Sequence, residues 1–169
     1  MDNTNSLTWE WLLGFIEGEG CFTVSHTKDS ERHYLIPKFE LFVSSDDRMI
    51  VENIRKFLGI GKIYYKRPRQ NLGYISKATV GLVVCKKKEL IILRNLLKPL
   101  HWHTKKQYDF LLWSSCIDII EQVRQTTYEG KMEIARYRDR LNGVKNKNER
   151  CNYYSAEKMQ ELLMKDEGK

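Results

Sequence analysis

The chain has 169 residues, of which 41% are hydrophobic, and its 29 Lys and Arg against 22 Asp and Glu give a net charge of +7. This length suits one folded domain with a sizeable core, and the hydrophobic content excludes a disordered chain. The positive charge favours a partner with a phosphate backbone, although a basic surface that only keeps the protein soluble would explain it equally well.

Residues 11–20, WLLGFIEGEG, form the first apolar run. They do not fit a signal peptide, because the acidic residues Asp2 and Glu10 precede the run where a basic segment is required. The run is also shorter than the roughly 20 apolar residues that span a bilayer. We therefore expect a soluble, intracellular protein with no membrane contact.

Hydrophobic periodicity predicts an α+β fold in which a four-stranded antiparallel sheet carries helices on one face. The expected elements are a helix at about 8–18, strands at 21–27 and 34–45, a helix from 46 that stops at Gly59, a hairpin at 61–85, a helix at 86–98 and further helices at 104–124, 129–143 and 155–165. Pro37 is expected to mark a strand start or an edge-like irregularity, since proline cannot donate a ladder hydrogen bond. We expect one domain, with its core over about 7–124 and C-terminal helices with a basic loop over about 125–169.

The alternating strands predict one polar sheet face. Hydrogen-bonding side chains at two-residue spacing on a basic sheet suit the base edges of a DNA major groove, which admits a β-ribbon. Polar sheet faces are usually only solvated, but the concentration of Lys and Arg at 62–69 favours DNA binding. The predicted face comprises Thr23, Ser25, Thr27, Lys38, Glu40, Ser44, Lys62, Tyr64, Lys66, Lys77 and Thr79, with Arg67 and Arg69 at a loop tip.

A basic loop, VKNKNERCNYY, separates the last two predicted helices. Its residues Lys145, Lys147 and Arg150 are candidates for phosphate contacts, and a solvated linker is an equally good interpretation. The cysteines form no CxxC pair, which argues against a zinc ribbon or a disulfide framework. We expect His101 and His103 to face solvent, because they lack the spacing of helical metal ligands.

Gly14 and Gly18 stand four residues apart on one face of the first helix, where a second helix can approach closely. If that helix belongs to a second copy of the chain, the two Glu19 carboxylates meet at the two-fold axis, and their repulsion favours a divalent cation between them. Carboxylate oxygens suit hard ions, Mg²⁺ above all, so this arrangement predicts a metal-dependent phosphodiesterase centre. We assign Leu13, Gly14 and Gly18 to the dimer interface.

The segment LLGFIEGEG at 12–20 resembles the LAGLIDADG motif of homing endonucleases, with glycines at 14, 18 and 20 and acidic residues at 17 and 19. It precedes two strands, a helix, FLGIGKIY and two further strands, so the resemblance covers nearly the whole chain. A single motif in a chain of this length resembles the homodimeric, intron-encoded branch. The resemblance implies the αββαββα homing endonuclease fold.

The resemblance also implies roles for single residues. Glu19 matches the family's metal-binding acid, where Asp is commoner, and the Gly18 carbonyl matches its main-chain ligand. Lys105, with Lys106 as the alternative, matches the basic residue that organises water around the scissile phosphate.

Other positions depart from the family pattern or extend it. Ser45 stands where the family usually has Gln, with Asp46 and Arg48 nearby, so we take Ser45 and Arg48 as candidates for the surrounding water network. Asn142 and Lys145 resemble the phosphate-contacting C-terminal loop.

The activity that the resemblance implies is hydrolysis of both strands of a long pseudo-palindromic DNA target, leaving short 3′ overhangs. Mg²⁺ is the expected cofactor; we expect Mn²⁺ to substitute for it and Ca²⁺ to support binding without cleavage. The alternatives are a maturase of the same fold that binds intron RNA and a structural protein bound to ribosomal RNA. The compartment is left open between chloroplast, mitochondrion and prokaryotic cytoplasm.

Overall fold

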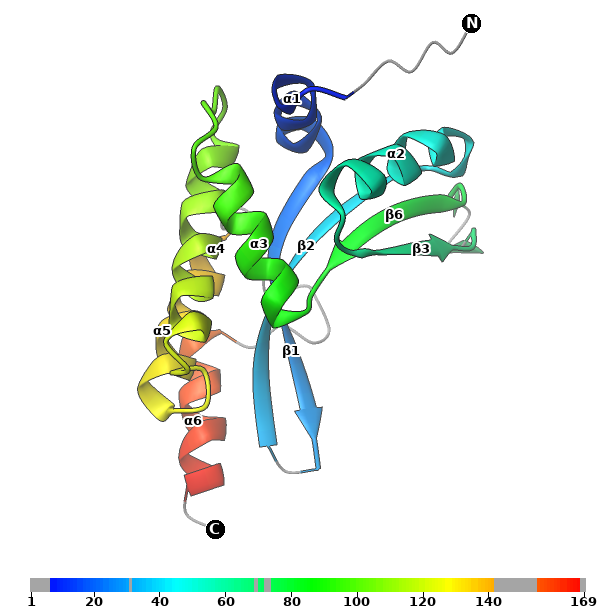
Figure 1. Ribbon diagram of the computed structural model, residues 1–169. Coiled ribbons are helices and arrows are strands. Elements are labelled where there is room, and N and C mark those ends of the chain that lie inside the picture. The colour runs from blue at the N-terminus through cyan, green and yellow to red at the C-terminus, as the bar shows by residue number, and fades with distance from the viewer. Residues whose placement is uncertain (1–6, 31, 69, 72–73, 142–154, 168–169) are drawn as a thin grey trace, which may run out of the picture. The chain divides into compact units, whose positions relative to one another are not determined.

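The computed structural model describes residues 7–30, 32–68, 70–71, 74–141 and 155–167 (Figure 1). By its internal contacts the chain divides into two compact units. The first unit contains residues 1–21 and 39–104, and the second contains residues 22–38 and 105–169. Two long strands, β1 (Gly20–Asp29) and β2 (Arg32–Ser44), contribute to both units.

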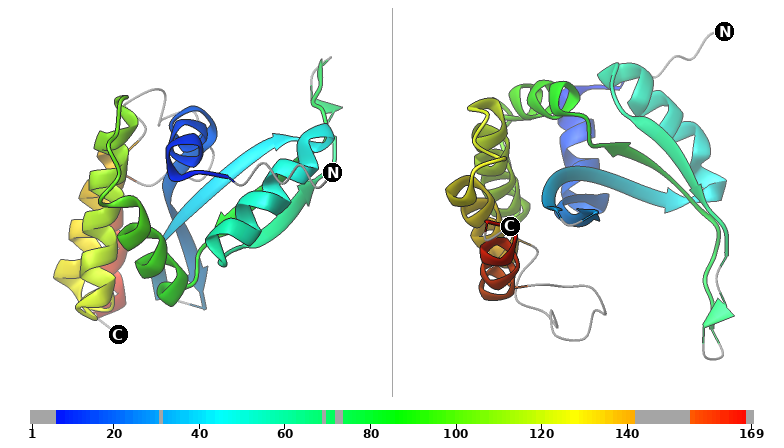
Figure 2. Two further views of the ribbon diagram at one scale, coloured as in Figure 1. Left: turned by 45° about the horizontal axis from the view of Figure 1, so that its top comes forward. Right: turned by 90° about the horizontal axis from the view of Figure 1, so that it is seen from below.

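The first unit is a sheet with helix α2 (Arg48–Leu58) packed on one face (Figures 1 and 2). Strand β6 (Thr79–Val84) pairs antiparallel with β2 on one side and with β3 (Lys62–Lys66) on the other. The complete strand order is β1-β2-β6-β3, which confirms the predicted four-stranded sheet. Helices α1 (Trp9–Glu19) and α3 (Lys87–Leu97) also belong to this unit.

The region predicted as the second hairpin contains two short strands in addition to the sheet strands β3 and β6. A two-stranded ribbon of β4 (Gln70–Asn71) and β5 (Tyr74–Ile75) continues from the ends of β3 and β6 and projects away from the sheet (Figure 2). The basic segment at 66–68 therefore follows directly on the end of the sheet strand β3.

Two glycines fix the connection from α2 to β3. Gly59 has a φ of 69° and ends α2, where its N–H donates to the carbonyl of Arg55, as the sequence predicts. Gly61 has a φ of 86°, and a Cβ there would lie 2.7 Å from the side chain of Leu82. Both positions require glycine, because L side chains rarely adopt positive φ.

Pro37 lies within β2, so it does not mark a strand start, one of the two possibilities that the sequence offered. The paired register of β2 with β6 begins at Phe39 and runs to Ser44. Because Pro37 precedes this register, its missing N–H leaves the β2–β6 ladder intact. The expected polar connection before β2 is also shorter than predicted, since β1 extends to Asp29 and β2 begins at Arg32.

The second unit combines the β1–β2 hairpin with helices α4 (Lys106–Glu121), α5 (Tyr128–Arg140) and α6 (Ala156–Glu167), of which α5 packs against both others. Phe22 of β1 is fully buried against α4, with ring centroids 5.6 Å from Phe110 and 5.1 Å from Trp113. None of the described helices has both the length and the apolar character that a bilayer span needs.

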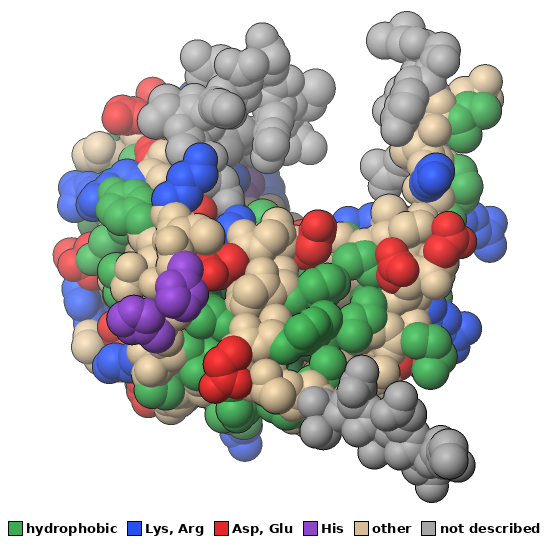
Figure 3. Space-filling view, turned by 90° about the horizontal axis from the view of Figure 1, so that it is seen from above, with side chains coloured by type: hydrophobic (Ala, Val, Ile, Leu, Met, Phe, Trp, Pro, Cys, Tyr) green, Lys and Arg blue, Asp and Glu red, His purple; other side chains and the backbone are tan. Residues whose placement is uncertain are grey.

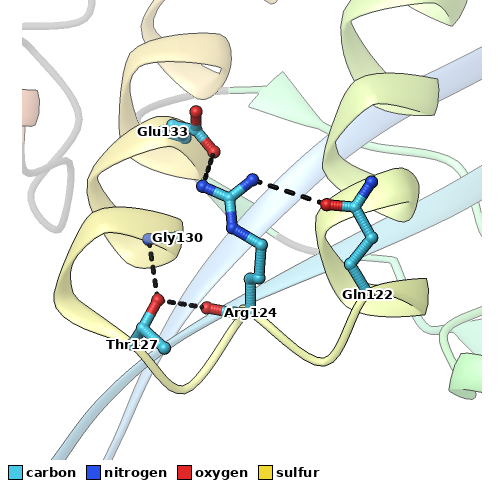
Figure 4. Close-up of polar contacts among 5 residues, drawn as sticks. All are labelled: Gln122, Arg124, Thr127, Gly130 and Glu133. Atoms are coloured by element: carbon cyan, nitrogen blue, oxygen red, sulfur yellow. Dashed lines mark hydrogen bonds and ion pairs between the residues drawn. The ribbon is translucent and has the colours of Figure 1, made fainter.

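The turn from α4 to α5 is held by side-chain contacts (Figure 4). Thr127 caps α5 by accepting the N–H of Gly130 at 3.1 Å, while its hydroxyl donates to the carbonyl of Arg124 at 2.8 Å. The guanidinium of Arg124 reaches Glu133 at 2.8 Å and thus ties the turn to the next turn of α5. Gly130 packs so closely that a Cβ there would lie 1.9 Å from the Arg124 carbonyl oxygen.

Candidate metal site and nucleic-acid interface

Glu19 is the last residue of α1, and its side chain is exposed. It borders an open hollow of about 410 Å³ in the first unit. The lining residues are Phe15, Glu19, Val43, Ser44, Asp47 and Ile50. Figure 3, which views the end of the molecule that carries α1, shows apolar side chains at the centre with acidic side chains around them.

The end of α1 has the chemistry of a hard-cation site. The last carbonyl groups of a helix lack intrahelical donors and carry the negative end of the helix dipole. The Gly18 carbonyl belongs to this last turn, beside the Glu19 carboxylate. Oxygen ligands of this kind suit Mg²⁺ or Ca²⁺. In the part of the chain that the structure describes, no three His, Cys, Asp or Glu side chains are grouped to hold a metal ion.

Glu17, the other acid of the motif, has a different environment. Its carboxylate accepts hydrogen bonds from the backbone N–H of His103 at 2.8 Å and of Thr104 at 2.7 Å. Burial acts to raise the pKa of Glu17, but the hydrogen bonds from His103 and Thr104 outweigh it and the pKa is lowered. Glu17 therefore fixes the segment that leads to Lys105, a role that the sequence did not reveal.

At the end of β2, Ser44 lines the hollow, whereas the sequence-based hypothesis for the water network concerned Ser45. Ser44 lines the hollow beside Glu19, and its hydroxyl accepts the N–H of Asp46 at 3.4 Å. Ser45 donates its backbone N–H to the carbonyl of Ala78 at 3.1 Å. The short 3-10 helix Ser45–Asp47 brings Asp47 to the hollow, a residue that the sequence analysis did not select.

Arg48, the other candidate for the water network, begins α2 and pairs with Glu52 at 2.5 Å. The hydrogen bond and the charge of Glu52 raise the pKa of the Arg48 guanidinium. The same guanidinium lies 5.5 Å from the ring centroid of Tyr65. These contacts occupy Arg48 on the α2 side of the sheet, and the hollow is lined instead by Asp47.

The strand register places the predicted polar residues of the first unit on one face. Successive rows across β2, β6 and β3 are Glu40–Val83–Lys62, Phe42–Gly81–Tyr64 and Ser44–Thr79–Lys66. Lys62, Tyr64 and Lys66 are exposed, as are Arg67 after β3 and Lys77 before β6. Phe42 also belongs to this face, although the sequence analysis did not count it as a binding residue. Arg69 lies outside the described residues.

In the second unit, Thr23, Ser25 and Thr27 alternate along β1 with the buried Phe22 and Val24. Lys38 is half-buried in β2, next to the division between the units. Lys105 precedes α4 and is exposed, whereas Lys106 is the first residue of that helix and half-buried. The loop candidates Asn142, Lys145, Lys147 and Arg150 lie outside the described residues.

The predicted dimer residues have different exposures. Gly14 and Gly18 are exposed, and a Cβ at either position would meet nothing within 4 Å. Leu13 is only 5% exposed, so a single chain offers little of its side chain to a partner helix, and its assignment to the dimer interface stays a prediction. Leu13 instead faces a second hollow with Pro99 and Leu100. The exposed stripe of α1 consists of Trp11, Gly14 and Gly18, and the half-buried Phe15 lies beside it, stacked on Trp11 at 4.9 Å between ring centroids.

A family model described as LAGLIDADG endonuclease matches residues 12–117, which include most of α1, the sheet, α2, α3 and most of α4. The chain belongs to the LAGLIDADG endonuclease family. The match confirms the resemblance seen in LLGFIEGEG and extends well beyond the motif.

Curated relatives of this LAGLIDADG chain include a probable intron-encoded endonuclease, Cox1-I1b, of Schizosaccharomyces pombe, which is 25% identical over 130 residues. That match covers 76% of this chain and 32% of the relative. A probable intron-encoded DNA endonuclease 1 of Mycosarcoma maydis is 27% identical over 62 residues, 37% of this chain and 22% of the relative. The chain thus spans about a fifth to a third of the length of these relatives.

Solved LAGLIDADG structures confirm the fold. The archaeal intron-encoded homing endonuclease I-Vdi141I, complexed with DNA, is 25% identical with a TM-score of 0.75, over 95% of this chain and 96% of that one. The meganuclease I-AabMI, bound to uncleaved DNA, is 30% identical with a TM-score of 0.66, over 78% of this chain and 43% of that one.

Proposed function

We propose that this chain is an intron-encoded homing endonuclease that cuts both strands of a long, pseudo-palindromic DNA site as a homodimer. The observation that carries the proposal is the position of Glu19. It ends the motif helix α1, is exposed, and borders an open hollow together with Ser44 and Asp47. A carboxylate that served only packing or solubility would not need this place at the end of the family motif.

Each residue of the site has a distinct task in phosphodiester hydrolysis. Glu19 and the Gly18 carbonyl would hold Mg²⁺, which would supply an activated water and charge stabilisation for hydrolysis of the phosphodiester. Lys105 orders water on the phosphate, and the segment that carries it is fixed by Glu17. The exposed Lys and Arg side chains of the polar sheet face bind the DNA.

The dimer follows from the exposed stripe of α1. Glycine in a helix costs about 0.8–1 kcal/mol relative to alanine. Since a Cβ at Gly14 or Gly18 would meet no atom of the described residues within 4 Å, the described packing does not explain these glycines. A second α1 helix packed along this stripe does explain them, because it needs close backbone approach. It also brings one Glu19 from each chain to the two scissile phosphates.

The proposal is tested by selecting cleaved sites from a random double-stranded DNA library in Mg²⁺, then comparing wild type with Glu19→Gln. We expect Glu19→Gln to bind the selected site as wild type does and to lose cleavage, because it keeps the side-chain shape without the charge. Ca²⁺ in place of Mg²⁺ should allow binding by wild type without turnover.

Glu10→Gln provides a matched control, since it removes the same charge from the first turn of the same helix. It should cleave normally. Normal nicking by Glu19→Gln would show that the metal assignment is wrong. Tight binding to intron RNA together with no cleavage of any DNA would show that the chain acts as a maturase.

A further inference from the structure

An aromatic residue lies in the middle of the polar sheet face of the first unit. Phe42 of β2 stands opposite Gly81 of β6, which stands opposite Tyr64 of β3. A Cβ at Gly81 would lie 2.3 Å from the Cδ1 atom of Phe42. The Phe42 ring thus lies across β6 in space that only glycine leaves open.

Lys66 reaches from β3 to this ring. Its Nζ atom lies 3.3 Å from the ring centroid of Phe42, which is close contact between a cation and an aromatic face. The Cα partners of Lys66 lie one row further along, at Thr79 and Ser44. The lysine stem therefore crosses β6, and the ammonium is held over the inner strands instead of at the β3 edge.

We propose that Phe42 is a positioning residue that holds the Lys66 ammonium over the centre of the polar face, where Lys66 reads a guanine of the DNA target. This inference rests on the proposed function. Phosphates flank a groove and base edges form its floor, so an ammonium over the inner strands is placed for a base edge. Lysine donates to the O6 and N7 acceptors of guanine.

The physical advantage is preorganisation. A free lysine side chain loses much of its rotamer freedom when its ammonium is fixed by a base. The Phe42 ring restricts Lys66 before DNA arrives, so less of that freedom is lost on binding. Because the Phe42 ring holds the ammonium over the centre of the sheet, Lys66 should contact a guanine edge at the floor of the groove in preference to a phosphate at its side.

The first test examines the protein without DNA. The aromatic ring current should shift the Lys66 side-chain methylene resonances upfield in the NMR spectrum of wild type. Phe42→Leu should remove the shift, and Phe42→Tyr should retain it because the aromatic face remains. Lys66 resonances at ordinary positions in folded wild type would overturn the proposal.

The second test measures affinity for the selected target in Ca²⁺, with each guanine replaced in turn by 7-deazaguanine, which lacks the N7 acceptor. One replacement should weaken wild-type binding by roughly 5- to 100-fold. Lys66→Met should lose this discrimination, and Phe42→Leu should lose most of it. The double variant Lys66→Met/Phe42→Leu should lose no more of the discrimination than Lys66→Met alone. Phe42→Tyr should keep the discrimination, because the aromatic face remains.

Tyr65→Leu is the matched control, because Tyr65 adjoins Lys66 in β3 but projects from the opposite, α2 side of the sheet. It should leave the discrimination unchanged. If Lys66→Met instead weakens all sequences alike and lowers the salt slope by about one, Lys66 contacts a phosphate and the proposal is wrong. Wild type that selects no DNA site would refute the proposed function itself, which the first test does not require.

Discussion

Glu17 and His103 are 86 positions apart in the sequence, yet the Glu17 carboxylate accepts the backbone N–H of His103 at 2.8 Å. Thr104 donates to the same oxygen at 2.7 Å. One acid of the motif thus fixes a distant backbone segment, while the other, Glu19, stays exposed beside the hollow. Two similar residues in one short motif therefore have different environments, and the chemical task that we propose belongs to Glu19 alone.

Glu17→Ala should lower the free energy of unfolding by about 1–2 kcal/mol, because two backbone N–H groups lose a charged acceptor. The loss is moderate because water can hydrogen-bond to the two N–H groups in its place. Glu17→Gln should cost less, since its amide oxygen still accepts. Urea unfolding of both variants measures the difference. A Glu17→Ala protein as stable as wild type would show that the two hydrogen bonds contribute nothing.

The stability contributed by Glu17 should depend on pH. Its pKa is lowered from the ordinary value of 4.5 in the folded protein, so the unfolded chain binds a proton more readily. The contribution is therefore complete above that unfolded-state value and is lost as the pH falls through the folded-state pKa. The difference in stability between wild type and Glu17→Gln should shrink over this acidic range, which unfolding curves at several pH values would show.

Lys105→Ala should reduce cleavage by about 100-fold or more while binding changes little, as expected for a group that assists proton transfer or orders water. Lys106→Ala is the control, because Lys106 is half-buried at the start of α4 whereas Lys105 is exposed before it. Single-turnover cleavage rates separate the two residues. A larger loss for Lys106→Ala would assign the role to the alternative lysine.

The sequence predicted the fold through periodicity and the family through the motif. Alternation along β2 assigned Glu40 and Ser44 to the correct face, since neighbouring strand residues point to opposite sides. It could not show that Phe42 lies across Gly81 beneath Lys66, because that contact joins three strands distant in sequence.

Other contacts could not be predicted for similar reasons. Leu13 is buried beside Pro99 and Leu100, and the local pattern of α1 does not indicate contact with that distant segment. The 3-10 turn after Ser44 brings Asp47 to the hollow, and the role suggested for Ser45 stays a prediction. Helix and strand periods predict positions within elements but not across an irregular turn.

Gly130→Ala should destabilise the second unit by about 1–3 kcal/mol, because the new Cβ would collide with the backbone of the α4–α5 turn. The nearest atom, the carbonyl oxygen of Arg124, would be only 1.9 Å away. Thermal unfolding should shift to a lower temperature, and a Gly130→Ala protein of normal stability would contradict the described packing.

Gly14→Leu should abolish dimerisation and double-strand cleavage together while the single chain still folds. Within one chain a Cβ at this position meets nothing within 4 Å, so the fold has room for the larger side chain. Two α1 helices packed along Gly14 and Gly18 have no such room, and the leucines would force their backbones apart. Sedimentation velocity reports the assembly state, and cleavage of a linear target reports the paired active sites. Circular dichroism should remain that of wild type. A Gly14→Leu protein that dimerises and cuts normally, or a wild-type monomer that cuts both strands, would refute the two-fold arrangement, because one chain supplies only one Glu19 for two scissile phosphates.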